Sequence, residues 1–305
     1  MKAIVCTQYG PPEVLKLVEL PKPTPKPHEV LIQIKASAVN SGDARVRGLV
    51  VKGLLKPIMR LVLGFNKPRK PILGNVFSGV VESVGNNVKR FKPGDAVFGM
   101  TGMRFGTYAE YLCLPETAHF HLMPHNATHQ EAAALVFGGQ TAIYFLEKMG
   151  LAQNPSAKVL IIGGSGAVGT AAIQVARNFK AEVDVVCGQK GEDLVKSLGA
   201  QQIWHYNNLD YHTLNKTYDA IFDAIGKTHK KQIAHLLAPQ GQFKTVGALE
   251  VAAESLHQVE QLKTWFENGQ YTACIDRVYP LEQIVQAHHY IDSGRKKGNV
   301  VLQIN

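Results

Sequence analysis

The sequence predicts an α/β protein with a β-rich domain and a second domain built on a doubly wound parallel sheet. Three observations lead to this prediction. The chain has 305 residues, enough for two hydrophobic cores. Up to about residue 125, short strand-like runs alternate with glycine and proline, whereas beyond residue 128 strand-like and helix-like runs follow each other. We expect domains at 1–125, completed by about 266–305, and at 126–265.

The elements follow in order along the chain. In the first domain, strands are expected within 29–40, 79–85, 95–100 and 107–114. In the second, residues 129–150 read as a helix, and further helices are expected at 191–200 and 230–239. Its strands are expected at Val159–Ile162, Val183–Cys187, Ala220–Ala224 and Gln242–Val246. The tail from Cys274 returns to strand, helix and strand, and should rejoin the first domain.

A glycine-rich turn joins the first of these strands to a helix. In "VLIIGGSGAVGTAAIQVAR" (Val159–Arg177), Gly164, Gly166 and Gly169 match G-x-G-x-x-G. Such glycines allow a tight turn, a close approach of the backbone to a pyrophosphate and close packing of helix on strand. A turn without a ligand is the alternative. We expect a dinucleotide site formed by Gly164, Ser165, Gly166, Ala167 and Val168.

The end of the second strand indicates which dinucleotide binds. An acidic residue there would favour the free ribose 2′-hydroxyl of NAD. The strand instead ends in Cys187-Gly188-Gln189-Lys190, and Glu192 and Asp193 lie beyond it on the expected helix. The missing carboxylate and Lys190 favour the 2′-phosphate of NADPH, with Gly188 and Lys190 in contact. The alternative for Lys190 is a solvated surface lysine.

Composition narrows the class of protein. The net charge is +9, but no nucleic-acid motif accompanies it. The four cysteines are far apart and never form C-x-x-C, which argues against a disulfide framework and fits a reducing compartment. The N-terminal "MKAIVCTQYG" is not a signal peptide, and no run is long enough to span a bilayer. We expect a cytoplasmic protein with no nucleic-acid or membrane partner.

Several stretches occur in a fixed order along nearly the whole chain, among them "PRKPILGNVFSGVVESVGNNVKRFKPGDAVFG", "FGTYAEYLCLPE", "EAAALVFGGQTAIYFL", "LVKSLGA" and "KKGNVVLQI". With the glycine turn, they resemble the medium-chain dehydrogenase/reductase superfamily, in its zinc-free quinone oxidoreductase branch. The resemblance implies a GroES-like catalytic domain and a Rossmann domain. It also implies NADPH-dependent reduction of a quinone or an α,β-unsaturated carbonyl.

The resemblance also concerns zinc. Where zinc-dependent relatives have their metal ligands, this chain has Asn40, Asn75, Val76 and Phe137. Zinc needs thiolate, imidazole or carboxylate ligands, so no metal is expected. Without a Lewis acid, oxidation of a plain alcohol is disfavoured, whereas a quinone or enone needs only hydride and a later proton. A zinc-dependent alcohol dehydrogenase and a catalytically inactive NADPH-binding regulatory or structural protein are the alternatives.

The resemblance assigns further site residues. Asn40 would lie beside the nicotinamide, or else serve as a turn asparagine, and Asp43 would orient this loop or take part in catalysis. The remaining candidates would contact the cofactor, with ordinary packing or turn roles as their alternatives: Thr141, Tyr206, Ala224, Ile225, Val246 and Gly247.

Three further segments concern the substrate cleft, a metal site and the oligomeric state. The basic, apolar stretch from Arg45 to Lys70 is similar to a flank of the substrate cleft in relatives, with contact to a membrane surface as the alternative. The histidines between His119 and His129 favour a linker over a metal site. After Leu249, a strand that pairs two subunits in most relatives is missing. The homodimer usual in relatives is therefore in doubt.

Overall fold

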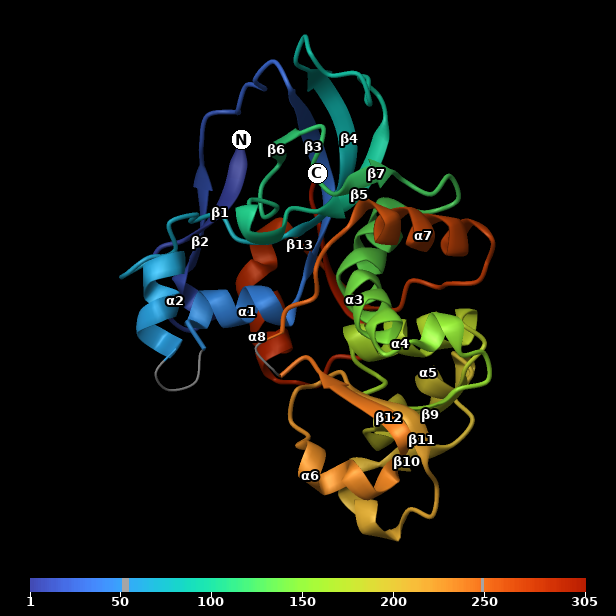
Figure 1. Cartoon of the computed structure of the whole chain (residues 1–305). Coiled ribbons are helices and arrows are strands. Elements are labelled where there is room, and N and C mark those ends of the chain that lie inside the picture. Colours follow the sequence, from blue (N-terminus) through green and yellow to red (C-terminus); the bar gives the residue numbers. More distant parts are fainter. Residues whose placement is uncertain (51–54, 248–249) are drawn as a thin grey trace. The chain divides into compact units, whose positions relative to one another are not determined.

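The computed structural model describes residues 1–50, 55–247 and 250–305, and Figure 1 shows the chain. The chain forms two compact units. The first unit comprises Met1–Val136 and Ile275–Asn305, and the second comprises Phe137–Cys274. The predicted α/β class, with a GroES-like β-rich part and a Rossmann-like parallel sheet, is confirmed.

The described residues of the first unit form a seven-stranded sheet in the order β13-β14-β3-β4-β5-β7, with β6 also paired to β3. The long strand β3 is central because it pairs antiparallel with β14, β4 and β6. A separate antiparallel pair consists of β1 (Lys2–Cys6) and β2 (Leu15–Glu19). The strands of the large sheet are β3 (Glu29–Val39), β4 (Val76–Val84), β5 (Ala96–Met100), β6 (Tyr111–Pro115), β7 (Phe120–Leu122), β13 (Ile275–Pro280) and β14 (Asn299–Gln303).

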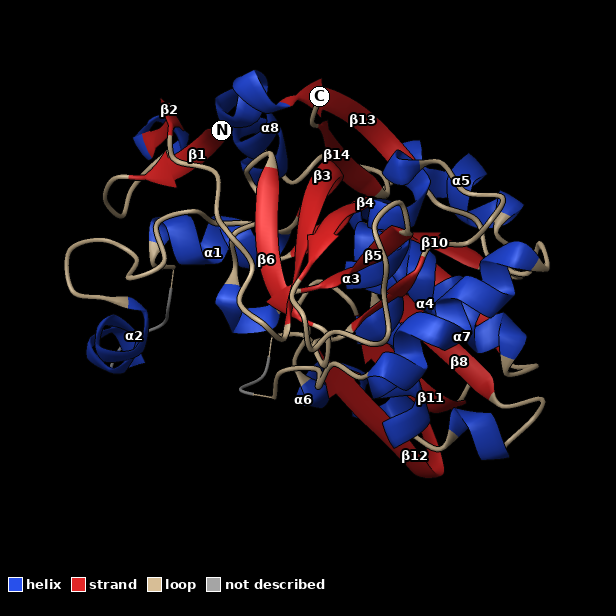
Figure 2. Cartoon of the chain, turned by 90° about the horizontal axis from the view of Figure 1, so that it is seen from above, coloured by secondary structure: helices blue, strands red, loops and turns tan. Residues whose placement is uncertain are grey.

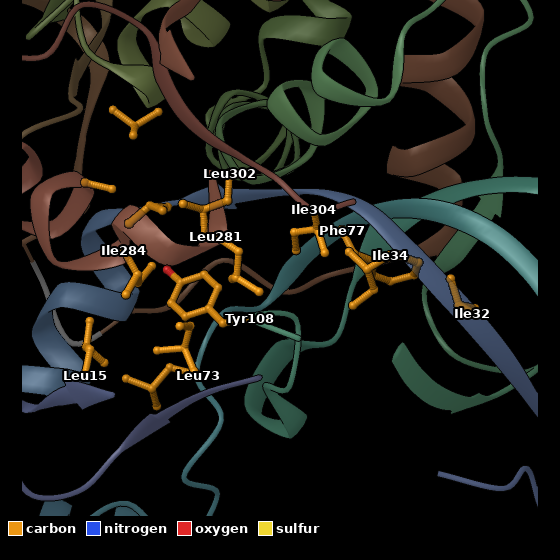
Figure 3. Close-up of a cluster of buried hydrophobic side chains, with 14 of the residues drawn as sticks. Leu15, Ile32, Ile34, Leu73, Phe77, Tyr108, Leu281, Ile284, Leu302 and Ile304 are labelled. Atoms are coloured by element: carbon orange, nitrogen blue, oxygen red, sulfur yellow. The ribbon is translucent and has the colours of Figure 1, made fainter. Parts of the chain in front are cut away.

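Among the described residues, three α-helices lie wholly within this unit: α1 (Ser41–Gly48), α2 (Leu55–Leu63) and α8 (Ile284–Asp292). The buried residues Ile284, Ala287 and Ile291 recur at helical spacing, so one face of α8 packs on the core. Figure 3 shows Tyr108 among the apolar side chains of this core. Tyr108 is fully buried, and its hydroxyl needs a partner there.

The second unit is built on a five-stranded sheet in the order β10-β9-β8-β11-β12, in which every pair is parallel. Numbered along the chain, the five strands lie in the order 3-2-1-4-5. The order in which strands are added therefore reverses between β8 and β11, although the strands themselves stay parallel. Ligands of such sheets bind at the carboxyl ends of the strands, beside this reversal. The strands are β8 (Lys158–Ile162), β9 (Glu182–Cys187), β10 (Ile203–His205), β11 (Tyr218–Asp223) and β12 (Leu237–Thr245).

The helices of the second unit alternate with its strands. The strand β8 leads into α4, β9 into α5 and β11 into α6, as the alternating sequence pattern predicts. The helix α3 spans the boundary between the units along the chain. The bounds are α3 (His129–Lys148), α4 (Ala167–Asn178), α5 (Glu192–Ser197), α6 (Lys230–Ile233) and α7 (Leu256–Glu267). Figure 2 distinguishes these helices from the strands by colour.

In the second unit, two elements differ from the sequence predictions. The helix expected at 230–239 is wrong in its second half, because α6 ends at Ile233 and β12 begins at Leu237. Leu237 pairs with Tyr218, so tertiary pairing overrides the apolar helical pattern. The sequence reading also missed β10, which is three residues long and half-buried.

The structure also bears on the segment after β12. Between Thr245 and Leu256, none of the described residues forms a strand, and residues 248–249 of the "VGAL" loop lie outside the described part. Residues 51–54 of the basic stretch lie outside it as well. No helix in the described ranges is long and apolar enough to cross a membrane.

Candidate functional site

The turn between β8 and α4 leads into a helix whose first N–H groups have no side-chain cap. The N–H groups of Gly163 and Gly164 donate to the carbonyl oxygen of Val186, at 2.8 and 3.1 Å, and so hold the turn against β9. Gly166 is the N-cap of α4 and has no side chain to satisfy the first helical N–H groups. The first helical bond runs from Thr170 N–H to Gly166 O, at 2.8 Å. The preceding N–H groups are a suitable binding site for a phosphate.

The three glycines of the motif differ in the space around them. A β-carbon at Gly169 would lie 2.0 Å from the carbonyl oxygen of Gly163, and one at Gly164 would lie 2.3 Å from Val185 Cγ1. These two glycines are required by packing within the chain. At Gly166 the nearest atom would be 3.6 Å away, which is an ordinary contact. The space beside Gly166 is therefore open to a ligand.

The tip of β9 lies against this turn. A β-carbon at Gly191 would be 2.5 Å from Ser165 Cβ, so the backbone after β9 touches the glycine turn. Gly188, Gln189 and Lys190 are exposed at this tip. Glu192 and Asp193 follow in the first turn of α5, where Glu192 Oε2 lies 3.0 Å from His205 Nε2.

Residues from two further strand ends meet the same turn. Gly163 has a φ of +91°, which favours glycine, and a β-carbon there would lie 2.3 Å from Ile225 Cγ1. The Tyr206 hydroxyl would be 3.5 Å from that β-carbon, although the residue as a whole is 40% exposed. Burial of the Tyr206 hydroxyl raises its pKa, so the phenol stays protonated and able to donate. The ends of β8, β10 and β11 therefore come together.

Asp223 organises the loop after β11, a role that the sequence reading missed. Its side chain is fully buried. Oδ1 accepts from the N–H groups of Ile225 and Gly226, both at 3.0 Å, and Oδ2 accepts from Thr228 N–H at 2.8 Å and Thr245 Oγ1 at 3.1 Å. These four bonds fix the loop and tie it to β12. The sequence feature that could have indicated this role is an aspartate, Asp223, directly after the apolar run of β11.

The loops after β11 and β12 touch through two glycines. A β-carbon at Gly226 would lie 2.7 Å from Gly247 Cα, and one at Gly247 would lie 2.4 Å from Gly226 O. Val246 N–H donates to Asp223 O at 3.1 Å, and Ala224 N–H donates to Ile162 O at 2.9 Å. The four strand-end candidates Ala224, Ile225, Val246 and Gly247 thus form one continuous backbone surface.

The candidate Thr141 lies on α3. Its hydroxyl donates to the carbonyl oxygen of Phe137, one turn earlier, at 2.7 Å. In the same turn, a β-carbon at Gly138 would be 2.4 Å from Ala167 O, so α3 packs closely on the first residue of α4. Thr141 is half-buried, and its hydroxyl is bonded within its own helix.

In the first unit, Asn40 caps α1 and forms a side-chain hydrogen bond with Asn75. Asn40 is 3% exposed, and its Oδ1 accepts from the N–H groups of Gly42 at 2.8 Å and Asp43 at 3.2 Å. Asp43 Oδ2 in turn accepts from Asn40 N–H at 3.2 Å, which completes a capping box. Asn40 Nδ2 donates to Asn75 Oδ1 at 2.8 Å. Because two backbone donors fix the oxygen of Asn40, the atom of Asn75 that faces Nδ2 must be its oxygen.

The side chains at the positions of zinc ligands do not fit zinc. Asn40 and Asn75 bond to each other through their amides, and Val76 is a buried aliphatic residue. None of these three supplies a thiolate, imidazole or carboxylate. Throughout the described part of the chain, including the histidines between His119 and His129, no three His, Cys, Asp or Glu residues are grouped to hold a metal ion.

A buried polar cluster connects α1 to α8. Asp43 accepts from the Tyr108 hydroxyl at 2.8 Å, and burial raises the pKa of Asp43 to about 7. Arg47 NH1 bonds His288 Nδ1 at 2.8 Å, and Arg47 NH2 donates to Asp292 Oδ2 at 2.6 Å. Burial, assisted by the Arg47 charge, lowers the pKa of His288 to about 3. His288 is therefore neutral, and the Tyr108 ring meets it edge-on with centroids 5.9 Å apart.

Asp43 and His288 are expected to contribute opposite slopes to the pH dependence of stability. The pKa of Asp43 lies above its ordinary 3.8, so the folded chain keeps a proton that the unfolded chain loses, and this contribution falls as pH rises from about 4 to 7. The pKa of His288 lies below its ordinary 6.5, so its contribution falls as pH drops from about 6.5 towards 3. The stability of Asp43→Asn relative to the original chain should therefore increase with pH, and that of His288→Gln should increase as pH falls. Urea unfolding at four pH values measures both differences, and parallel curves for all three proteins would contradict them.

Comparison with known families gives matches over both units. Residues 26–125 match the alcohol dehydrogenase GroES-like domain. Residues 167–275 and 250–302 match two models described as zinc-binding dehydrogenase.

Individual relatives cover the whole chain. A 2-methylene-furan-3-one reductase of Solanum lycopersicum is 32% identical over 99% of this chain and 79% of its own length. A chloroplastic NADPH-dependent alkenal/one oxidoreductase of Arabidopsis thaliana is 29% identical over the same shares. The solved structure of the quinone oxidoreductase from Coxiella burnetii superimposes with a TM-score of 0.89 at 26% identity, covering 100% of this chain and 99% of that one.

Proposed function

Because the chain belongs to the medium-chain dehydrogenase/reductase superfamily and is an oxidoreductase, we propose that it reduces a quinone or an α,β-unsaturated carbonyl with NADPH and without zinc. The observation that carries this proposal is the second unit's cluster of strand ends around the start of α4, where the N-cap Gly166 supplies no side chain to the first helical N–H groups. The names of the tomato and Arabidopsis relatives and of the Coxiella structure support the substrate class.

The residues of the second unit would hold the cofactor as follows. NADPH, when bound, supplies the hydride. The N–H groups of Ser165, Ala167 and Val168 would bind its pyrophosphate in the open space beside Gly166, whose own N–H donates to Gly163 O. Lys190, which is exposed at the tip of β9, would pair with the 2′-phosphate together with Gly188. Tyr206 would lie along the adenylate.

The remaining candidates of this unit would face the nicotinamide. Ala224, Ile225, Val246 and Gly247 form the backbone surface at the ends of β11 and β12, which Asp223 holds in place. Thr141 would contribute a side-chain contact from α3. A nicotinamide cofactor is part of the names of two relatives, the Arabidopsis NADPH-dependent alkenal/one oxidoreductase and a mitochondrial NAD(P)H oxidoreductase of Danio rerio.

In the first unit, Asn75 is the group best arranged to bind a substrate oxygen. Its Oδ1 is occupied by Asn40, which leaves the Nδ2 donors available, and the residue is half-buried. A donor fixed by its neighbours stabilises a carbonyl oxygen that gains negative charge as hydride arrives. We assign Asn40 and Asp43 to positioning, since the capping box fixes the amide that orients Asn75.

The cofactor proposal is tested by titrating purified protein with NADPH and NADH and following nicotinamide fluorescence, then adding 1,4-benzoquinone or an enone to the same cuvette. Tight NADPH binding with turnover is the expected result. Binding without turnover would overturn the reductase and favour the inactive NADPH-binding protein, whereas absence of binding would leave the glycine segment as a turn only. Stoichiometric zinc in the active protein would overturn the zinc-free mechanism.

Lys190→Ala is expected to weaken NADPH binding by about tenfold and to leave NADH binding unchanged, because only NADPH carries the 2′-phosphate that the ammonium would neutralise. Lys196→Ala, an exposed lysine on α5, is the matched control and should change neither affinity. Equal losses for both cofactors, or for both lysines, would show that Lys190 does not read the 2′-phosphate.

A further inference from the structure

The helix α2 presents a stripe of large apolar side chains to solvent. Ile58, Leu61 and Val62 follow the spacing i, i+3, i+4 on α2, and Phe65 lies in the turn that follows Gly64; we call these four residues the α2 stripe. They are 56%, 60%, 54% and 62% exposed, respectively. Contiguous apolar surface of this kind marks an interaction site more often than ordinary surface.

The α2 stripe is not a core face awaiting its partner within the unit. The opposite side of α2 is already packed, because Leu63 is buried against Leu49 and Phe105, with Met59 beside them. Figures 1 and 2 show α2 at the margin of its unit, beyond α1. The Tyr9 hydroxyl donates to Gly64 O at 2.8 Å and fixes the end of the helix. One face of α2 thus packs within its own unit, and the other face is exposed and available to a binding partner.

Positive charge surrounds the stripe. Residues 55–81 contain five Lys or Arg residues and no Asp or Glu. Arg60 on α2 and Lys67, Arg69 and Lys70 in the following turn are exposed. The turn folds back on the helix, since Arg69 N–H donates to Leu63 O at 2.7 Å. The cations therefore lie beside the apolar stripe.

We propose that the α2 stripe and its cationic surroundings dock on an anionic phospholipid surface. An amphipathic helix of this kind lies in the plane of the interface, with apolar side chains at the acyl boundary and Lys and Arg at the headgroup phosphates. Both chemistries are present in one place, and no acidic side chain in the segment would repel the lipid phosphates. The contact is peripheral, since α2 has only nine residues.

Cosedimentation with vesicles tests the proposal. Vesicles of phosphatidylcholine alone are compared with vesicles that contain about one third phosphatidylglycerol. The intact protein should bind the anionic vesicles, and added salt should weaken the binding. Leu61→Gln/Val62→Gln should lower the partition coefficient at least about tenfold, because two large apolar side chains leave the interface.

The matched control is Leu17→Gln/Val278→Gln, which changes two apolar residues of similar exposure, 45% and 46%, on β2 and β13. It should bind anionic vesicles like the original chain, and all variants should bind NADPH equally. Three results would overturn the proposal: no preference for anionic vesicles, unchanged binding of the stripe variant, or a dimer in light scattering that only the stripe variant dissociates. A raised KM for a soluble quinone without any vesicle effect would instead make the stripe a wall of the substrate cleft, and would also overturn it.

Discussion

Replacing Gly169 by alanine is expected to destabilise the protein by at least about 3 kcal/mol, a large part of the stability of about 5–15 kcal/mol that is typical of native proteins. The added β-carbon would lie 2.0 Å from Gly163 O and 2.7 Å from Gly164 Cα. Both are backbone atoms, so no side-chain rotation relieves the overlap. The start of α4 would have to move away from β8, which separates the phosphate turn from the sheet.

Urea unfolding followed by circular dichroism measures this loss. Gly166→Ala is the matched control, because its β-carbon meets nothing closer than 3.6 Å and the N-cap has an extended backbone that alanine adopts. We expect Gly166→Ala to cost about 1 kcal/mol or less and yet to weaken NADPH binding, because the methyl group occupies the space for the phosphate. Equal stability of the two variants would contradict the proposed division of roles between the glycines.

Replacing Asn75 by aspartate is expected to lower kcat/KM for a quinone or enone by about a hundredfold, while the affinity for NADPH and the stability stay close to their original values. Aspartate has the same shape and keeps an oxygen that accepts from Asn40 Nδ2, so the pair with Asn40 survives. What disappears is the amide donor. A negative charge beside a carbonyl oxygen that becomes negative adds to the loss.

Two further variants distinguish hydrogen-bond donation by Asn75 to the substrate from its structural support of Asn40. Asn75→Ala should lose a similar share of kcat/KM and, because the Nδ2 of buried Asn40 then lacks its partner, should also lose about 1 to 3 kcal/mol of stability. Asn86→Ala, in an exposed turn of the same unit, should change neither quantity. Full activity of Asn75→Asp would show that Asn75 only supports Asn40.

The sequence was informative where a single physical pattern decides the structure. The strands β8 and β9 lie within one residue of the predicted ranges, because short continuous apolar runs such as Val159–Ile162, next to glycine turns, are typical of strands buried on both faces. The start of α4 could be predicted equally well, since the spacing of the glycines indicates the local backbone geometry. The limits appear at β12, whose first residues read as helix until pairing with β11 draws them into the sheet.

The site was predictable only in part for a related reason. The residues of the glycine turn could be predicted as cofactor-binding, because they follow one another in the sequence. The contact of Ser165 with Gly191, the four bonds to Asp223 and the bond between Asn40 and Asn75 join residues that are far apart in sequence. Their meeting depends on strand order and register, which alternating patterns do not specify. Asn75 was therefore seen as a missing zinc ligand and not as a donor.

The strand β12 has one more consequence. In the described part of the chain it is the last strand of its sheet, and nothing pairs with its outer side. Its first half is interrupted: two steps along β11, from Tyr218 to Ala220, correspond to five along β12, from Leu237 to Gln242. The bulge contains Pro239, which has no N–H to offer, and Gln240 with a φ of +68°. Only Gln242–Thr245 remain as a regular ladder, so the open edge is a poor template for β-aggregation, and the protein should stay dispersed at high concentration without a further strand to cover it.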